Sequence, residues 1–235
     1  ADAIITTISG VPGVTVRPTS AVMPYAKETV NALAAGRDLR VEAVVEGTVQ
    51  RSTSQLHVSV RLLSVADGQS IWGQTFDVTE GDVLSVQRAI AEQVARTMSP
   101  QLDQSVWNRL AGHGTKNLDA YRAYLEGRVL WNERTEAGFK KAISSFERAL
   151  SLDPRYAPAY AGVADCQTLL AIWGGEADLV RLAKAAALRA VRYDDSLPEA
   201  HGSLALVRWI YDWNWDEADR EFRRALELNA NYATA

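Results

Sequence analysis

The sequence has few of the residues that build catalytic, redox or metal centres. Its 235 residues include one cysteine and three histidines, which excludes an internal disulfide and argues against a zinc site, because such a site needs several clustered nitrogen or sulfur ligands. No glycine-rich loop is followed by a lysine that would hold phosphates, and no serine lies in a nucleophile-elbow pattern. We therefore expect no enzyme activity, no bound metal and no cofactor.

Charge and hydropathy exclude two further classes of function. The formal net charge is −4, and nucleic-acid binding normally needs a basic excess. No apolar run reaches the roughly 20 residues that span a bilayer. We expect neither direct nucleic-acid binding nor membrane insertion. The expected location is the cytoplasm, or the periplasm if a transmembrane helix precedes this sequence in a longer protein.

Three segments in the second half of the chain repeat one another: residues 142–154, 183–195 and 218–230. Each has alanine at its first and eighth positions, and the aligned alanines Ala149, Ala190 and Ala225 are 41 and 35 residues apart. The alanines, and the residue between them, share one stripe of a helix. A period in this range, with helical spacing only, predicts a stacked array of helix pairs.

These residues resemble tetratricopeptide repeats, whose second helix has the same Ala…Phe…Ala…Pro spacing. Phe146 and Pro154 occupy those places in the first copy. The resemblance covers 117–235 and divides it into repeats 117–156, 157–197 and 198–235. It implies a groove lined by the first helices that binds a peptide or protein. The candidate contact residues are Tyr124, Arg128, Trp131, Tyr160, Asp165, Thr168, Ser203, Val207 and Tyr211. An alternative is that the tryptophans at the helix corners only close the packing between helices.

The first half predicts a small α/β domain. Residues 1–9 indicate a helix, residues 14–18 a short strand, and residues 24–36 a second helix that Pro24 opens. Three strands follow at 41–50, 55–65 and 71–78, with a hairpin signal at Asp67-Gly68. A long helix at 82–98 and a connecting helix at 102–110 complete the pattern. Only one strand face is wholly apolar, so we expect a three-stranded antiparallel meander with helices on one face.

The first 110 residues also have a family likeness. The segments that carry it are 45–51, 56–63, 67–72, 76–77 and 82–87. They resemble the TolB amino-terminal-like domain, which is related to the FlgO fold. That family often precedes tetratricopeptide repeats, downstream of a CadC-like winged-helix DNA-binding domain, a serine/threonine kinase or a nucleotide cyclase. Residues 111–116, with glycine on both sides of His113, are expected to form the linker.

The two likenesses together imply a non-catalytic interaction or sensory module of a larger bacterial signalling or transcription-regulatory protein. The family's first strand is missing here, and a fourth repeat would start after Ala235, so we expect the chain to be part of a longer protein that carries the output domain. The alternative function is an envelope or assembly component. Such a component would use the open edge of the α/β domain to bind partners or to form a homodimer.

Overall fold

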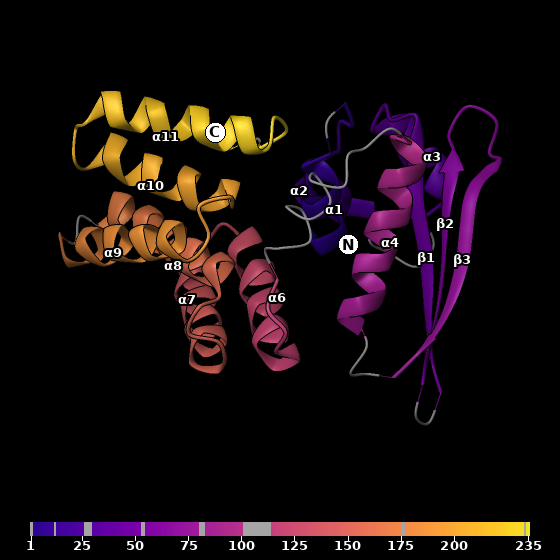
Figure 1. The fold of residues 1–235 in the computed structure, drawn as a ribbon, viewed down its shortest axis with the longest axis horizontal. Coiled ribbons are helices and arrows are strands. Elements are labelled where there is room, and N and C mark those ends of the chain that lie inside the picture. Colours follow the sequence, from indigo (N-terminus) through magenta and orange to yellow (C-terminus); the bar gives the residue numbers. More distant parts are fainter. Residues whose placement is uncertain are drawn as a thin grey trace. The chain divides into compact units, whose positions relative to one another are not determined.

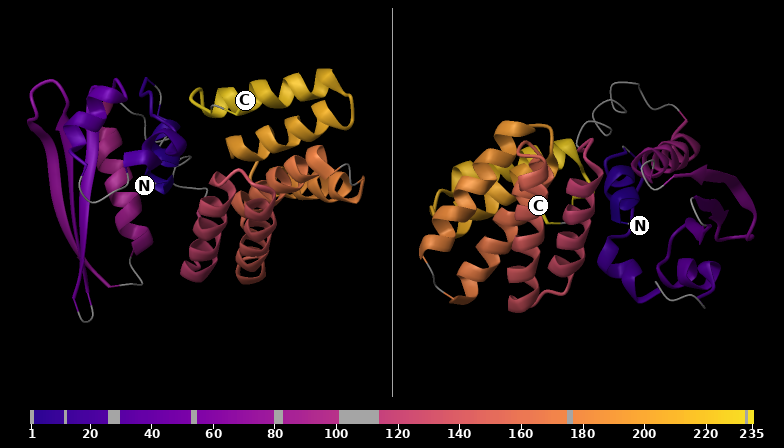
Figure 2. Two further views of the ribbon diagram at one scale, coloured as in Figure 1. Left: turned by 180° about the vertical axis from the view of Figure 1, so that it is seen from behind. Right: turned by 90° about the horizontal axis from the view of Figure 1, so that it is seen from below.

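A computed structural model describes residues 2–11, 13–25, 30–52, 55–79, 83–100, 114–174, 177–232 and 234–235. The chain divides into two compact units, residues 1–108 and 109–235, which Figures 1 and 2 show from three directions.

The first unit contains the predicted antiparallel meander. Its elements are α1 (Asp2–Ser9), α2 (Thr19–Val22), the 3-10 turn η1 (Met23–Tyr25), α3 (Ala32–Asp38), β1 (Ala43–Arg51), β2 (Leu56–Ser64), β3 (Ser70–Val78) and α4 (Val83–Met98). The strand order is β1-β2-β3, and both pairs are antiparallel. Gly68, at a φ of 73°, lies in the β2–β3 turn, where Asp67 accepts a hydrogen bond from the Gln69 amide at 3.1 Å. The predicted hairpin is confirmed.

The core of the first unit lies between one sheet face and the long helix. Val60 and Leu62 of β2 pack in one cluster with Val86, Ile90 and Val94 of α4, which share one face of that helix. Ile8 of α1 joins the same cluster. On the opposite face, His57, Ser59 and Arg61 meet Asp77, Thr75 and Glu46 in polar pairs. Alternation of apolar and polar residues therefore decided which face α1 and α4 cover.

Helix α3 departs from the expectation that all helices cover one face. A side chain at Gly36 would come within 2.7 Å of Val44 and 2.6 Å of Val65, so this glycine lets α3 approach the end of the sheet. Val44 alternates with Val45 along β1, and its side chain therefore belongs to the face opposite the α4 core. The hairpin end of that face is apolar enough to hold a short helix.

Two other predictions for the first unit need correction. Residues 14–18 form no strand; Val14 and Val16 pack against the core, while the Arg17 side chain donates to the Leu39 carbonyl at 2.8 Å. The single helix predicted at 24–36 is replaced by η1 and α3, because the Asn31 side chain accepts from the amides of residues 33 and 34 and starts a new helix there. The connecting helix predicted at 102–110 lies outside the described residues.

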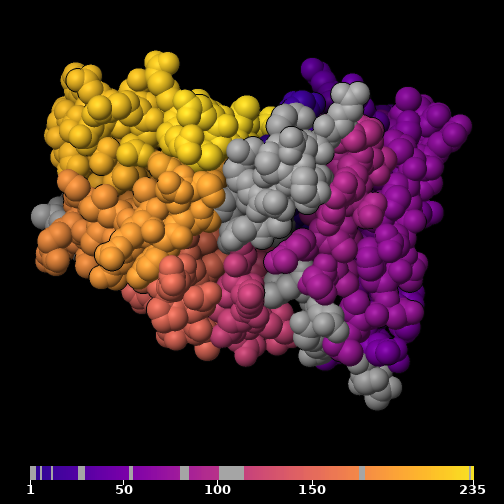
Figure 3. Space-filling model, viewed as in Figure 1, coloured from indigo at the N-terminus to yellow at the C-terminus, as the bar shows by residue number. Residues whose placement is uncertain are grey.

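The second unit contains three antiparallel helix pairs in succession. Its helices are α6 (Leu118–Asn132), α7 (Glu136–Leu152), α8 (Ala157–Gly174), α9 (Ala177–Tyr193), α10 (Pro198–Ile210) and α11 (Trp215–Leu228). Helix α6 packs on α7, α8 on α9 and α10 on α11, and each pair packs on the next. The surfaces of successive pairs run on from one to the next without a break (Figure 3). The predicted array is confirmed.

The alanine stripes lie where neighbouring helices of the array pack against each other, and this line of contact is called the seam. Ala142, Ala149, Ala190 and Ala225 are each 0% exposed, so their small side chains let neighbouring helices approach closely. Phe146 is also 0% exposed. A Cβ at Gly127 or Gly162 would come within 2.5 or 2.6 Å of its ring, so two glycines on two first helices make room for one phenyl ring.

Each second helix ends in the same local turn. After α7, α9 and α11, the side chains of Asp153, Asp194 and Asn229 accept a hydrogen bond from the amide two residues further on, at 3.1, 3.0 and 2.9 Å. These side chains compete with the helix for main-chain donors and stop it. Thr115, which we placed in the linker, is buried and donates to the Asp153 carboxylate at 2.6 Å. It therefore belongs to the array; residues 111–113 of the predicted linker lie outside the described residues.

Candidate functional site

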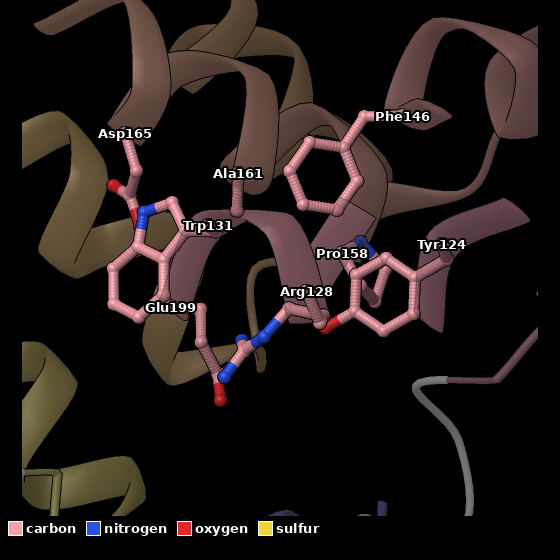
Figure 4. A pocket seen from close by; sticks show the side chains of 9 residues that line it. Tyr124, Arg128, Trp131, Phe146, Pro158, Ala161, Asp165 and Glu199 are labelled. Atoms are coloured by element: carbon pink, nitrogen blue, oxygen red, sulfur yellow. The ribbon is translucent and has the colours of Figure 1, made fainter. Parts of the chain in front are cut away.

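A pocket on the array is built by the first helices of all three pairs. Figure 4 shows the residues that line it. Tyr124, Arg128 and Trp131 come from α6, Pro158, Ala161, Gly162 and Asp165 from α8, and Glu199 from α10, while Phe146 of α7 closes one side. The pocket encloses room for about one water molecule. Its size suits the tip of a side chain or one main-chain group.

The Asp165 carboxyl of the pocket has a raised pKa. Burial raises the pKa of its carboxyl to about 6, whereas the hydrogen bond from Ser203 and the positive charge of Arg128 act in the opposite direction. Ser203 Oγ donates to Asp165 Oδ1 at 2.6 Å. A carboxyl group whose pKa lies near neutral pH, inside a pocket, is common in binding and catalytic sites.

The indole of Trp131 is contacted by two arginines. The Arg134 guanidinium carbon lies 3.7 Å from the centre of the ring and that of Arg128 lies 5.4 Å away. These are cation–π contacts that fix the ring. The indole N–H is buried and makes no hydrogen bond within the described part of the chain. A buried donor of this kind costs free energy unless an acceptor is supplied, so the pocket is able to receive an acceptor group.

Four of the nine predicted contact residues line this pocket: Tyr124, Arg128, Trp131 and Asp165. Tyr160 lies elsewhere, since its ring stacks on Tyr193 with centroids 5.5 Å apart. Tyr211 is at the end of α10, where its hydroxyl donates to the Thr168 carbonyl at 3.0 Å. Both tyrosines serve the packing of the helices.

The prediction that Thr168, Ser203 and Val207 lie on the contact surface needs correction. They are 0%, 1% and 0% exposed, so they offer no surface to a partner. The Thr168 hydroxyl donates to the Ala164 carbonyl at 2.7 Å. Ser203 still acts on the site, because it orients the Asp165 carboxylate from behind.

The sequence reasoning missed Pro158, Ala161, Gly162, Phe146 and Glu199. Pro158 and Glu199 share a signal that was available: each is the second residue of its helix, directly after the turn that ends the preceding repeat. Counting from those turns, rather than from the alanine stripe, identifies Pro158 and Glu199 as equivalent positions in successive repeats.

Three further findings concern other properties of the described residues. Cys166 is free and 0% exposed, and burial raises the pKa of its thiol, as expected for a structural cysteine. Among the residues that the structure describes, no group of three or more His, Cys, Asp or Glu side chains is placed to hold a metal ion. None of the described helices is long and apolar enough to cross a membrane.

Comparison with known proteins gives one informative relative. No family model matches the chain. The chain is 26% identical, over 215 residues, to a Rhizobium meliloti (strain 1021) protein named "Putative adenylate cyclase 3". The match covers 88% of this chain and 36% of that protein, so the chain spans about a third of the relative's length. It is therefore similar to one region of a bacterial protein whose name indicates cyclic-nucleotide signalling.

Proposed function

We propose that this chain is a non-catalytic module of a larger bacterial signalling protein, and that the pocket side of its helical array binds a peptide or protein segment. The array resembles tetratricopeptide repeats in its pair-wise packing and its buried alanines, and the first unit resembles the TolB amino-terminal-like domain. The relative in Rhizobium meliloti supports the signalling context. An accessory region of a nucleotide cyclase is the context that this relative favours among those considered.

The observation that carries the proposal is the pocket at the junction of three first helices. A site assembled from α6, α8 and α10 at once needs the whole array to be folded. It offers an aromatic wall at Tyr124, positive charge at Arg128, an unmet donor at Trp131, and carboxylates at Asp165 and Glu199. An extended peptide presents alternating donors and acceptors together with side-chain tips, and these groups match the pocket.

The proposal is tested with peptides selected by phage display on the immobilised chain. Binding of each selected peptide is then measured by fluorescence anisotropy. We expect Tyr124→Ala and Arg128→Ala to weaken binding about tenfold or more, as truncation of an aromatic or arginine anchor does. Lys140→Ala is the matched control, because Lys140 is exposed on α7, where it pairs with Glu136, and it is not among the residues that line the pocket.

Two results would contradict the proposal. If the selected peptides bind Tyr124→Ala, Arg128→Ala and Lys140→Ala with equal affinity, the pocket is not the binding site. Hydrolysis or conversion of a nucleotide by this chain alone would contradict the non-catalytic assignment. Both measurements use the chain as it stands.

A further inference from the structure

The outer edge of β1 exposes valines on the apolar side of the sheet. Val45 is 40% and Val49 66% exposed. Both lie on the face that carries the core, because the pairing places Val45 beside Leu62 and Val49 beside Val58. Within the described residues, no strand pairs with this edge. The apolar layer of the first unit therefore continues past its helices onto an open strand.

The hydrogen bonds at the two ends of the β1–β2 ladder show which main-chain groups face outward. The amide of Val65 donates to the Glu42 carbonyl, and the amide of Ser52 to the Gln55 carbonyl, both at 2.9 Å. Bonded and non-bonded pairs alternate in an antiparallel ladder, and this one has no shift in register. Even-numbered β1 residues therefore bond to β2. The N–H and C=O groups of Ala43, Val45, Gly47 and Val49 point away from the sheet.

The other edge of the sheet is different in character. Residues 58, 60 and 62 of β2 bond toward β3, so residues 76, 74 and 72 are their bonded partners. The outward groups of β3 are then those of Gly73, Thr75 and Asp77, which lie on the polar face. A strand added at either edge would lie beside side chains of both faces. On the apolar face, Trp72 and Phe76 of β3 are already packed against the core, whereas Val45 and Val49 of β1 are exposed. The β1 edge is the one suited to an apolar partner strand.

We propose that two copies of this chain associate by antiparallel pairing of their β1 strands about a two-fold axis at Gly47. In this register Val45 of one copy faces Val49 of the second copy, and their outward main-chain groups form bonded pairs. Gly47 meets itself at the axis, where it has no side chain to obstruct the approach. The product is one continuous six-stranded sheet, with the four valines joining the two apolar layers.

The sequence of β1 suits a second copy, because Val45 and Val49 lie symmetrically on either side of Gly47 on the same face of the sheet. Glu46 faces Thr48 across the axis, and Ala43 faces Arg51, so no like charges lie directly opposite each other. The strand has no proline and no lysine, the residues that usually protect an exposed edge from pairing. It is also nine residues long, which is longer than edge strands that are protected by shortness.

The first test is sedimentation velocity over a series of protein concentrations. We expect the unaltered chain to shift from monomer to dimer as concentration rises. Val49→Pro removes an outward N–H without losing a bond to β2, and should raise the dissociation constant about tenfold or more. Thr75→Pro is the matched control at the outward edge of β3 and should leave dimerisation unchanged. Circular dichroism checks that both variants are folded, and Val49→Lys is the second variant if proline disturbs the strand.

The second test reads the register. Val45→Cys and Val49→Cys variants are mixed under mild oxidation; bonded antiparallel pairs have Cα atoms about 5.5 Å apart, within disulfide range. Cys166 does not compete, because it is 0% exposed. We expect a disulfide-linked heterodimer in the mixture and little linkage in either variant alone. A chain that stays monomeric at every concentration, a Val49→Pro or Val49→Lys variant that dimerises like the unaltered chain, or equal linkage in a single variant would overturn the proposal.

Discussion

Replacing Asp165 by asparagine should make the array more stable at pH 8. Asparagine has nearly the same shape and keeps an oxygen to accept the 2.6 Å hydrogen bond from Ser203, but it carries no charge. Burial raises the pKa of the Asp165 carboxyl from 3.8 to about 6. Each pKa unit corresponds to about 1.4 kcal/mol, so the buried charge destabilises the folded array by up to about 3 kcal/mol at high pH.

The sign of the pH dependence follows from linkage. Because the pKa of Asp165 is higher in the folded than in the unfolded chain, the folded state binds this proton more tightly. The contribution of Asp165 to the free energy of unfolding therefore rises as pH falls from about 6 to about 4, and is constant outside that range. The asparagine variant lacks this change. Its advantage should be largest at pH 8 and should vanish near pH 4.

Urea unfolding at several pH values, followed by tryptophan fluorescence, measures the difference. Five of the seven tryptophans, at positions 131, 173, 209, 213 and 215, belong to the array, so the signal reports mainly on this unit. Asp195→Asn is the control, since Asp195 is an exposed aspartate in the turn after α9. A difference between Asp165→Asn and the unaltered chain that stays constant from pH 8 to pH 4 would refute the reasoning. The same variant should bind selected peptides more weakly, which would show that the buried charge is kept for binding at the expense of stability.

Three further changes test the packing of the array, each by thermal or urea unfolding. Gly127→Ala should destabilise it by about 1–3 kcal/mol, because the new Cβ would come within 2.5 Å of the Phe146 ring; an unchanged midpoint would show that the ring moves freely. Ala149→Trp should overpack the seam by a similar amount or more, since Ala149 is 0% exposed, and no loss of stability would place the seam elsewhere. His201→Leu should cost about 1–3 kcal/mol, because the ring contacts Glu221 at 2.6 Å and the Asp195 carbonyl at 2.8 Å, and a variant as stable as the unaltered chain would mean that neither bond contributes.

The array could be predicted because its signal is local and repeated. Small residues at fixed helical spacing, such as Ala142 and Ala149, need to lie in a seam whatever their distant neighbours are. The β2 strand was equally clear, since Val58, Val60 and Leu62 alternate with polar residues and one face had to be buried. The strand predicted at residues 14–18 was wrong because its signal is not local. A short apolar segment becomes a strand only where another strand pairs with it.

The sequence by itself determined most of the elements, their order, and the inward faces of β2 and of the second helices of the repeats, because those properties follow from periodicity along one segment. Only the tertiary structure decided which side chains share the pocket. Glu199 and Tyr124 are 75 positions apart, and they share the pocket only because α6, α8 and α10 pack side by side. Gly127 and Gly162 let α6 and α8 approach Phe146, and the Ser203–Asp165 hydrogen bond links α10 to α8. No single segment encodes these contacts.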